Sequence, residues 1–163
     1  MVVALAVRVR RCDELDLAAL EWYGMFTSHR EIIRDAYRRQ LAGENEMLIG
    51  ELAGTPVAQL WIDLTKRRDQ HIGAFWALRV FPILRGLGLG TTLLARGEDW
   101  LRERGYHQAE IGVETDNPRA QQLYERLGYR VVTSVREPYT YRRPDGTLIN
   151  AIADQRVLRK PLR

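Results

Sequence analysis

The chain has 163 residues, 45% of them hydrophobic and 28% charged, values that indicate one globular α/β domain spanning residues 1–163. One cysteine, Cys12, excludes an internal disulfide and a cysteine metal cluster, and it predicts a reducing, cytoplasmic setting. No run approaches the ~20 apolar residues of a membrane helix, and the apolar start over residues 1–7 is too short for a signal peptide. We therefore expect no membrane partner.

The net charge is +4, which favours anionic ligands. The basic residues are scattered in pairs and short runs, as at Arg10-Arg11 and Lys66-Arg67-Arg68, and solvated helix faces and loops explain such pairs better than a nucleic-acid groove. The three histidines, His29, His71 and His107, share no metal-binding or triad spacing. We expect neither a nucleic-acid partner nor a metal.

The first half of the chain predicts two helices and four strands. A strand over 4–10 precedes a helix that starts near Asp13. Ser28 and Glu31 form a capping-box pair for a second helix that ends at Gly43. Residues 46–53 and 56–64 predict a hairpin, and the apolar run 71–81 predicts a central strand that is covered on both faces.

The second half predicts a helix over 88–104, a strand over 107–114 and a helix from Asn117 to Gly128, where glycine suits the left-handed C-terminal position. Strands at 129–136 and 150–160 flank a polar segment that contains the turn Pro144-Asp145-Gly146. This order predicts a mixed central sheet of about seven strands, with helices on both faces and a parallel crossover at its centre.

A glycine-rich turn, Arg85-Gly86-Leu87-Gly88-Leu89-Gly90-Thr91, joins the central strand to a helix. The free N–H groups of a helix start attract anions, and alternate glycines let the backbone approach a pyrophosphate. A tight turn without a ligand fits the glycines equally well. A dinucleotide site, with Glu110 as the acidic partner, is disfavoured because Thr91 occupies the last fingerprint position and the turn lies mid-chain.

Two segments in sequence carry a family resemblance. Residues 117–129, Asn-Pro-Arg-Ala-Gln-Gln-Leu-Tyr-Glu-Arg-Leu-Gly-Tyr, match the N-x-x-A-x-x-L-Y-x-x-x-G-F/Y signature of GNAT acetyltransferases. Residues 78–90 resemble the V-x-P-x-x-R-G-x-G-x-G/A segment of the same family, and the element order resembles it from about residue 4 to 160. The resemblance implies the GNAT fold, with a sheet splayed between its two central parallel strands.

The resemblance also implies an N-acetyltransferase that uses acetyl-CoA as co-substrate and no metal. A primary amine, which we expect to belong to a small molecule, would attack the thioester directly in a ternary complex. The backbone around Leu78 and Val80 would pair with the pantetheine arm, and Asn117 would contact it. The pyrophosphate would be held by Arg85, Gly86, Gly88, Gly90 and Thr91, and the 3′-phosphate and adenine end by Arg119 and Arg126.

For catalysis, the resemblance implies that the Val80 amide points at the thioester carbonyl and that Tyr124 protonates the departing sulfur. From its spacing alone, Tyr124 fits a core aromatic better than a catalytic residue, and only the motif favours the catalytic role. The strand region 75–79 lacks the carboxylate that many family members carry there. Glu110 and Glu114 share one face of the next strand, and we name Glu114 as the base because it lies nearer the strand's C-terminal end. Each of them fits a surface or ion-paired carboxylate better than a base.

Arg79 is the one charged residue in the apolar strand, and a buried arginine needs a partner. We expect it to pair with Glu110 or Glu114, with an acidic group of the acceptor as the alternative. Aromatic residues at 22–26 and at Tyr139 and Tyr141 suit an amine site, the core or a homodimer interface equally. Two other functions stay open: a noncatalytic acyl-CoA-binding regulatory module, and acetylation of a protein or peptide amine.

Overall fold

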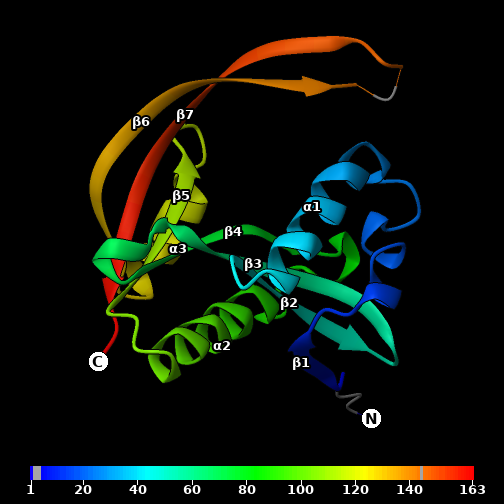
Figure 1. The fold of residues 1–163 in the computed structure, drawn as a ribbon. Coiled ribbons are helices and arrows are strands. Elements are labelled where there is room, and N and C mark those ends of the chain that lie inside the picture. Colours follow the sequence, from blue (N-terminus) through cyan, green and yellow to red (C-terminus); the bar gives the residue numbers. More distant parts are fainter. Residues whose placement is uncertain (2–4, 144) are drawn as a thin grey trace.

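The computed structural model describes residues 1, 5–143 and 145–163, and in this part of the chain seven strands form one mixed, open sheet (Figure 1). The strand order is β1-β2-β3-β4-β5-β7-β6. The strands are β1 (Val7–Arg11), β2 (Asn45–Leu52), β3 (Thr55–Arg67), β4 (Ile72–Val80), β5 (Gln108–Glu114), β6 (Arg130–Arg142) and β7 (Leu148–Pro161). The predicted mixed sheet with helices on both faces is confirmed.

The sheet opens at its centre, between β4 and β5. These strands are parallel and pair only from Ile72 with Gln108 to Phe75 with Ile111. Beyond Phe75, β4 carries a bulge in its pairing with β3, where Ala77 adopts the left-handed conformation with φ of 53°. A bulge bends the strand that carries it, so the end of β4 separates from β5. The predicted splay is present.

One face of the sheet is covered by α2 (Leu89–Glu103) and α3 (Pro118–Arg126). Helix α2 approaches the sheet closely at Gly97, because a Cβ there would lie 2.8 Å from Leu60 and 3.0 Å from Phe75. Beside it, the buried carboxylate of Glu98 accepts a hydrogen bond from the Tyr129 hydroxyl at 2.8 Å and pairs with Lys160 at 2.9 Å. These contacts tie the middle of α2 to the segment between α3 and β6 and to β7.

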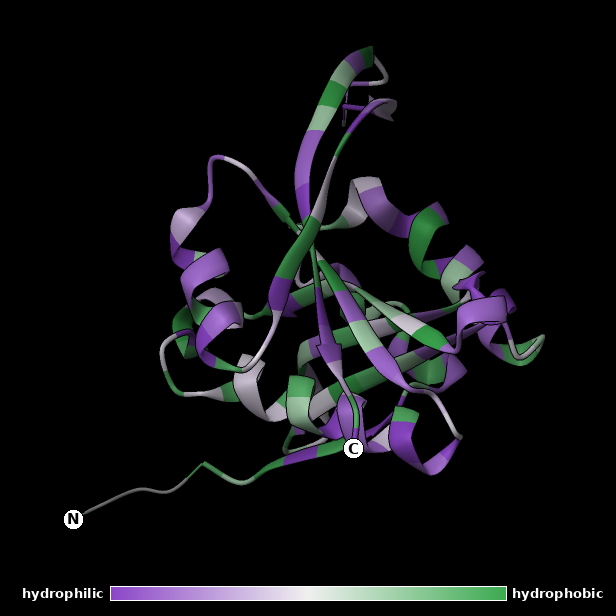
Figure 2. Cartoon of the chain, turned by 90° about the vertical axis from the view of Figure 1, so that its left-hand side faces the viewer, coloured by the Kyte–Doolittle hydropathy of each residue, from purple (hydrophilic) through white to green (hydrophobic). Residues whose placement is uncertain are grey.

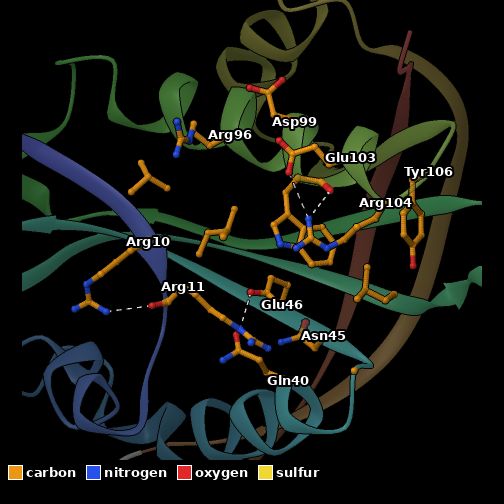
Figure 3. Close-up of a pocket in the computed structure, with 15 residues that line it drawn as sticks. Arg10, Arg11, Gln40, Asn45, Glu46, Arg96, Asp99, Glu103, Arg104 and Tyr106 are labelled. Carbon is orange, nitrogen blue, oxygen red and sulfur yellow. Dashed lines mark hydrogen bonds and ion pairs between the residues drawn. The ribbon is translucent and has the colours of Figure 1, made fainter.

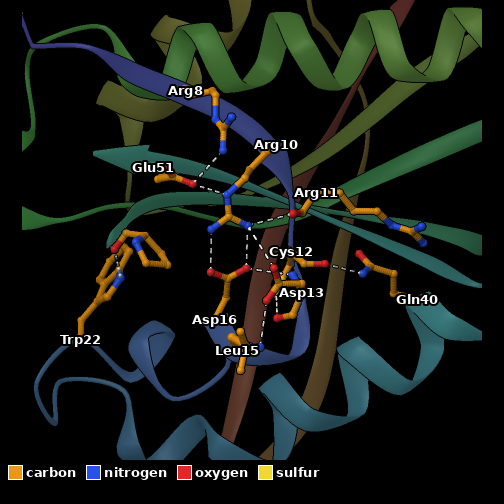
Figure 4. A network of polar contacts seen from close by, with 11 residues as sticks. Arg8, Arg10, Arg11, Cys12, Asp13, Leu15, Asp16, Trp22, Gln40 and Glu51 are labelled. Atoms are coloured by element: carbon orange, nitrogen blue, oxygen red, sulfur yellow. Dashed lines mark hydrogen bonds and ion pairs between the residues drawn. The ribbon is translucent and has the colours of Figure 1, made fainter. Parts of the chain in front are cut away.

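The other face is covered by α1 (Arg30–Leu41) and the chain that precedes it (Figure 1). Figure 4 shows Arg10 of β1 between the carboxylates of Asp16 and Glu51, with an Arg10–Asp16 distance of 2.7 Å. Burial raises the pKa of Asp16, but the hydrogen bonds from Arg10, the Asp13 backbone and Cys12, together with the charge of Arg10, outweigh burial and lower the pKa below its ordinary value. Burial also raises the pKa of the neighbouring Cys12 thiol to about 12. This network fixes the first turn after β1 against the sheet.

The predicted helix after Asp13 is wrong. The segment forms three short 3-10 turns, Glu14–Asp16, Ala19–Glu21 and Thr27–His29. Asp13 caps the first of them in a capping box with Asp16, while Trp22 and Tyr23 both adopt left-handed conformations that no α-helix accommodates.

The predicted cap of the next helix is also wrong, because α1 begins at Arg30 after His29 and has no side-chain hydrogen bond at its start. Its end before Gly43 is confirmed, and Gly43 has a positive φ of 74°. Residue 4, the expected start of the first strand, lies outside the described residues.

The sequence predicts that the strands end at residue 136 and begin again at residue 150, with a polar segment containing a turn between them, but most of that segment is β-structure. Pairing continues from Glu137 with Ala153 to Arg142 with Leu148, so β6 and β7 form one long hairpin. Its far end projects from the body of the molecule, beyond the side of the sheet on which α1 lies (Figures 1 and 2). Of the expected turn, Asp145 and Gly146 belong to the connection, and Pro144 lies outside the described residues.

Candidate active site

The glycine-rich turn ends β4 and starts α2. Gly88 immediately precedes the first residue of α2 and has a φ of 83°, and Gly86 has a φ of 79°. A Cβ at either glycine would meet nothing within 4 Å, and the first turn of α2 contains no acidic side chain. Free N–H groups at the helix start therefore face open space without a competing negative charge, which is an arrangement that fits a phosphate group.

The end of β4 presents backbone groups to the opening in the sheet. The Phe81 N–H donates to the Val57 carbonyl of β3 at 2.8 Å. Because successive residues of a strand point their N–H groups to opposite sides, the Val80 N–H faces the opening toward β5. On that side the Val80 carbonyl accepts a hydrogen bond from Arg85 Nε at 3.2 Å. The turn is thus tied to the strand end, and a Cβ on Gly90 would lie 4.0 Å from Val80.

Tyr124 of α3 belongs to the core cluster against which Leu78 and Val80 pack. Its ring meets Tyr129 edge-on at 6.2 Å, and burial raises the pKa of its hydroxyl. In residues 1, 5–143 and 145–163 no hydrogen-bond partner of that hydroxyl is found, so it is a protonated donor that the fold does not use. The helix itself starts as predicted, with Asn117 Oδ1 accepting from the Ala120 N–H at 3.2 Å and Pro118 in first place.

The other predicted ligands lie at the edges of this region. Thr91 is exposed in the first turn of α2, and Arg119 and Arg126 are exposed on α3. No hydrogen bond or ion pair within the described part of the chain joins either α3 arginine to the turn at Arg85. Their role at the adenine end stays a prediction.

Glu114 lies exposed at the end of β5 and accepts a hydrogen bond from Gln155 at 2.9 Å. Glu110 is buried on the same strand and is held by Arg159 at 2.9 Å and Arg67 at 3.5 Å. The expected pairing of Arg79 with either carboxylate is therefore wrong. Arg79 instead stacks on Phe26, with 4.1 Å from the guanidinium carbon to the ring centre. The sequence pattern predicted the strands correctly, but it did not show that β7 supplies the partners of these carboxylates, Arg159 for Glu110 and Gln155 for Glu114.

Aromatic residues from the segment before α1 gather at the end of β4. Trp22 packs edge-on against Phe26 at 5.4 Å and against Phe81 at 5.6 Å, and its Nε1 donates to the Pro56 carbonyl at 3.1 Å. Trp22, Tyr23 and Phe81 line a cavity of about 550 Å³. The sequence indicated aromatic residues at 22–26, but Phe81 carried no signal of its own. By contrast, Tyr139 and Tyr141 stack on each other, exposed on the hairpin.

A larger cavity, of about 770 Å³, lies between β1, β2 and the second half of α2 (Figure 3). Charged side chains of both signs line it, among them Arg11, Glu46 and Arg104. Burial raises the pKa of Glu46, which pairs with Arg11 at 2.9 Å. None of the predicted site residues lines this cavity, and it lies at the end of α2 that is remote from Gly88.

No helix in the described residues is long and apolar enough to cross a membrane, and this part of the chain assembles no cluster of three potential metal ligands. The site therefore consists of the turn from Arg85 to Thr91, the end of β4 and the facing ends of β5 and α3. An open mixed sheet with this site is the architecture of the GNAT fold.

Solved structures share this architecture over nearly the whole chain. A spermidine N-acetyltransferase chimera from Vibrio cholerae and hSSAT superposes with a TM-score of 0.74 at 15% identity, covering 96% of this chain and 95% of that one. The putative acetyltransferase yncA from Salmonella typhimurium, solved with acetyl-CoA, gives 0.73 at 20% identity, covering 97% and 95%. At these identities the likeness establishes the fold.

The sequence pattern described as Acetyltransferase (GNAT) family matches residues 12–129, and the chain belongs to this family. The mycothiol acetyltransferase of Beutenbergia cavernae is 39% identical over 79 residues, which are 48% of this chain and 26% of that protein. The corresponding protein of Propionibacterium freudenreichii is 28% identical over 132 residues, or 76% and 42%. The chain spans less than half the length of these curated relatives.

Proposed function

We propose that this protein is an N-acetyltransferase that transfers the acetyl group of acetyl-CoA to the primary amine of a small molecule. The observation that carries the proposal is the Val80 N–H, which faces the opening beside the phosphate-binding turn. Gly86 and Gly88 leave the space that a pyrophosphate needs, and bound acetyl-CoA supplies an activated acetyl thioester. Family membership and the curated acetyltransferases at modest identity support the same activity.

The residues of the site suit direct attack in a ternary complex. The new N–C bond forms as the C–S bond breaks, the amine loses a proton, and the thiolate gains one. A preorganised N–H such as that of Val80 stabilises the negative charge on the carbonyl oxygen by roughly 3 kcal/mol. Tyr124, which burial keeps protonated, donates to the sulfur, and Glu114 accepts the amine proton. Its exposure at the end of β5 leaves Glu114 accessible to water and substrate.

Thiol release from acetyl-CoA, measured over a panel of small amines, tests the proposal. We expect turnover with at least one amine and a matching acetylated product by mass spectrometry. Binding of CoA without turnover of any small amine, peptide amine or protein amine would instead support the noncatalytic acyl-CoA-binding module. Turnover of peptide amines alone would favour a protein acceptor. Calorimetric binding of a nicotinamide dinucleotide without binding of CoA would overturn both.

Three further properties belong to this proposal. The single domain over residues 1–163, the cytoplasmic location and the homodimer remain predictions. Gel filtration with light scattering measures the oligomeric state directly.

A further inference from the structure

Arg79 has a charge that the fold leaves unbalanced. It lies half-buried near the end of β4, and its guanidinium stacks on Phe26. Within residues 1, 5–143 and 145–163 it forms no ion pair with a carboxylate and no side-chain hydrogen bond. A stacked aromatic ring contacts only the flat face of a guanidinium, so the N–H donors at the edge of the group still need acceptors.

Those donors reach solvent instead of being sealed in the core. The buried polar atoms without a hydrogen-bond partner in the described residues are His29 Nδ1, Trp61 Nε1 and Arg67 Nε, and none belongs to Arg79. Burial lowers the pKa of Arg79, but an ordinary guanidinium pKa above 12 leaves the group charged at neutral pH. Its edge is thus a charged donor surface that faces accessible space.

The neighbours of Arg79 add no negative charge. The His29 ring lies 5.4 Å from the ring of Phe26, the residue on which Arg79 stacks. Burial, and to a smaller extent the nearby charge of Arg79, lowers the pKa of His29. His29 is therefore neutral at pH 7. Neither carboxylate expected from the sequence pairs with Arg79: Glu110 is ion-paired with Arg159 and Arg67, and Glu114 accepts a hydrogen bond from the neutral Gln155 amide and keeps its charge. Within the described residues, the Arg79 guanidinium therefore has no carboxylate paired with it.

Arg79 lies on the face of the sheet where we expect the acceptor amine, and not on the face where we expect the phosphates of acetyl-CoA. It adjoins Val80 in the chain, but its side chain contacts Phe26 on the face that α1 covers, whereas Val80 packs into the core on the α2 face. Glu114 alternates with the core residue Val113 and so points to the same face as Arg79. An amine near Glu114 and the end of β4 would bring its other substituents toward Arg79.

We propose that Arg79 binds a carboxylate carried by the acceptor amine, so that the preferred substrates are amino-acid-like molecules. This inference rests on the proposed acetyltransferase function. A guanidinium edge donates two parallel hydrogen bonds to a carboxylate, and Phe26 shields one face of the pair from water. The same positive charge repels polyamines such as the spermidine named for one structural neighbour.

Matched acceptors test this directly. For wild type, kcat/KM is measured for several amino acids, for the amide of each and for 1,4-diaminobutane, using thiol release from acetyl-CoA. We expect the acid to be preferred, with the diamine the poorest acceptor. In Arg79→Met, which keeps the aliphatic stem against Phe26, kcat/KM for the acids falls by about 10- to 100-fold, the range of a charged hydrogen bond, while that for the amides changes little.

The ratio of acid to amide in the variant, divided by that in wild type, cancels the different basicity of the two amines. Arg79→Lys retains part of the preference, and Arg79→Glu shifts it toward the diamine. Arg38→Gln, which removes an exposed arginine paired with Asp35 on α1, leaves it unchanged. Melting temperatures of all variants are recorded. If Arg79→Met is unfolded, the acid-to-amide ratios of kcat/KM in wild type and in Arg79→Lys test the inference instead.

Equal use of acids and amides by wild type, or an unchanged ratio in Arg79→Met, would overturn the inference and leave the acetyltransferase intact. A preference for the diamine would do the same. If neither these acceptors nor any other small amine of the panel described above is turned over, the proposed function is overturned, and this inference with it.

Discussion

The two sides of the end of β4 present different kinds of chemical groups. On the α2 side the candidate ligands are backbone N–H groups and glycines within one continuous turn, Arg85 to Thr91. On the α1 side the candidate ligands are side chains from separate segments: Trp22 and Phe26 from the chain before α1, and Arg79 from β4. Backbone recognition suits a phosphate-bearing co-substrate, whereas side-chain recognition lets one fold accept different amines.

The difference also separates stability from specificity. The α2 side is held by buried contacts such as that of Glu98 with Lys160 and Tyr129. The α1 side contains two consecutive left-handed aromatic residues, Trp22 and Tyr23, and Arg79, which pairs with no carboxylate in the part of the chain that the structure describes. Strain and unbalanced charge of this kind cost stability, and they concentrate on the side where we place the acceptor.

The largest effect is expected at Glu98. In Glu98→Ala the Lys160 ammonium and the Tyr129 hydroxyl lose their buried partner, and we expect about 3–5 kcal/mol less free energy of unfolding. Urea unfolding measures the change. Asp99→Ala, which breaks an exposed pair with Arg102, is the control and should cost under about 1 kcal/mol. Equal losses in the two variants would contradict the structural role of Glu98.

Tyr124→Phe tests the chemistry on the same side of the sheet. We expect kcat to fall by ~10²-fold or more because the sulfur loses its proton donor, with CoA affinity nearly unchanged. Since burial raises the pKa of Tyr124, the hydroxyl stays protonated to higher pH, and wild-type kcat should not fall through loss of this proton below the ordinary tyrosine value of ~10. Tyr106→Phe, at the larger cavity remote from the turn, is the control. A wild-type kcat in Tyr124→Phe would remove this residue from the mechanism.

Gly88→Ala tests recognition by the turn. Its Cβ would stand in the open space before α2, and we expect the Kd of CoA, measured by calorimetry, to rise by about tenfold. Gly43→Ala is matched, since Gly43 also has a positive φ and open surroundings. Each of the two variants should lower the free energy of unfolding by ~1–2 kcal/mol, because alanine is strained at a positive φ, but Gly43→Ala should leave the Kd of CoA unchanged. An equal effect of the two variants on CoA binding would show that strain, and not access to phosphate, is responsible.

The smallest effect concerns acid stability on the α1 side. Because the pKa of Asp16 is lowered in the fold, its contribution is fully present above the ordinary aspartate value of ~3.9 and is lost as pH falls through the lower folded value. Asp16→Asn should therefore reduce the loss of unfolding free energy over that acidic range, as measured by urea titrations at each pH. Leu15→Ala, an exposed neighbour, should leave the pH dependence unchanged. If the dependence of the unfolding free energy on pH is the same in Asp16→Asn as in wild type, this would contradict the network in Figure 4.

The sequence by itself determined the features that depend on neighbours in the chain. Hydrophobic periodicity gave the central strands, Asn117 and Pro118 marked the start of α3, and alternate glycines marked the turn before α2. These signals are local because helix caps and left-handed glycines are satisfied within a few residues.

Only the tertiary structure decided what depends on residues far apart in the chain. The bulge at Ala77 has no glycine to signal it, and it arises from pairing with β3. The partners of Arg79 and Glu110 depended on which residues β7 and the segment before α1 bring to the sheet, since ion pairs form between whichever charges the fold places in contact. The length of the β6–β7 hairpin likewise followed from cross-strand pairing, which gives polar sequence a β-structure that its composition did not predict.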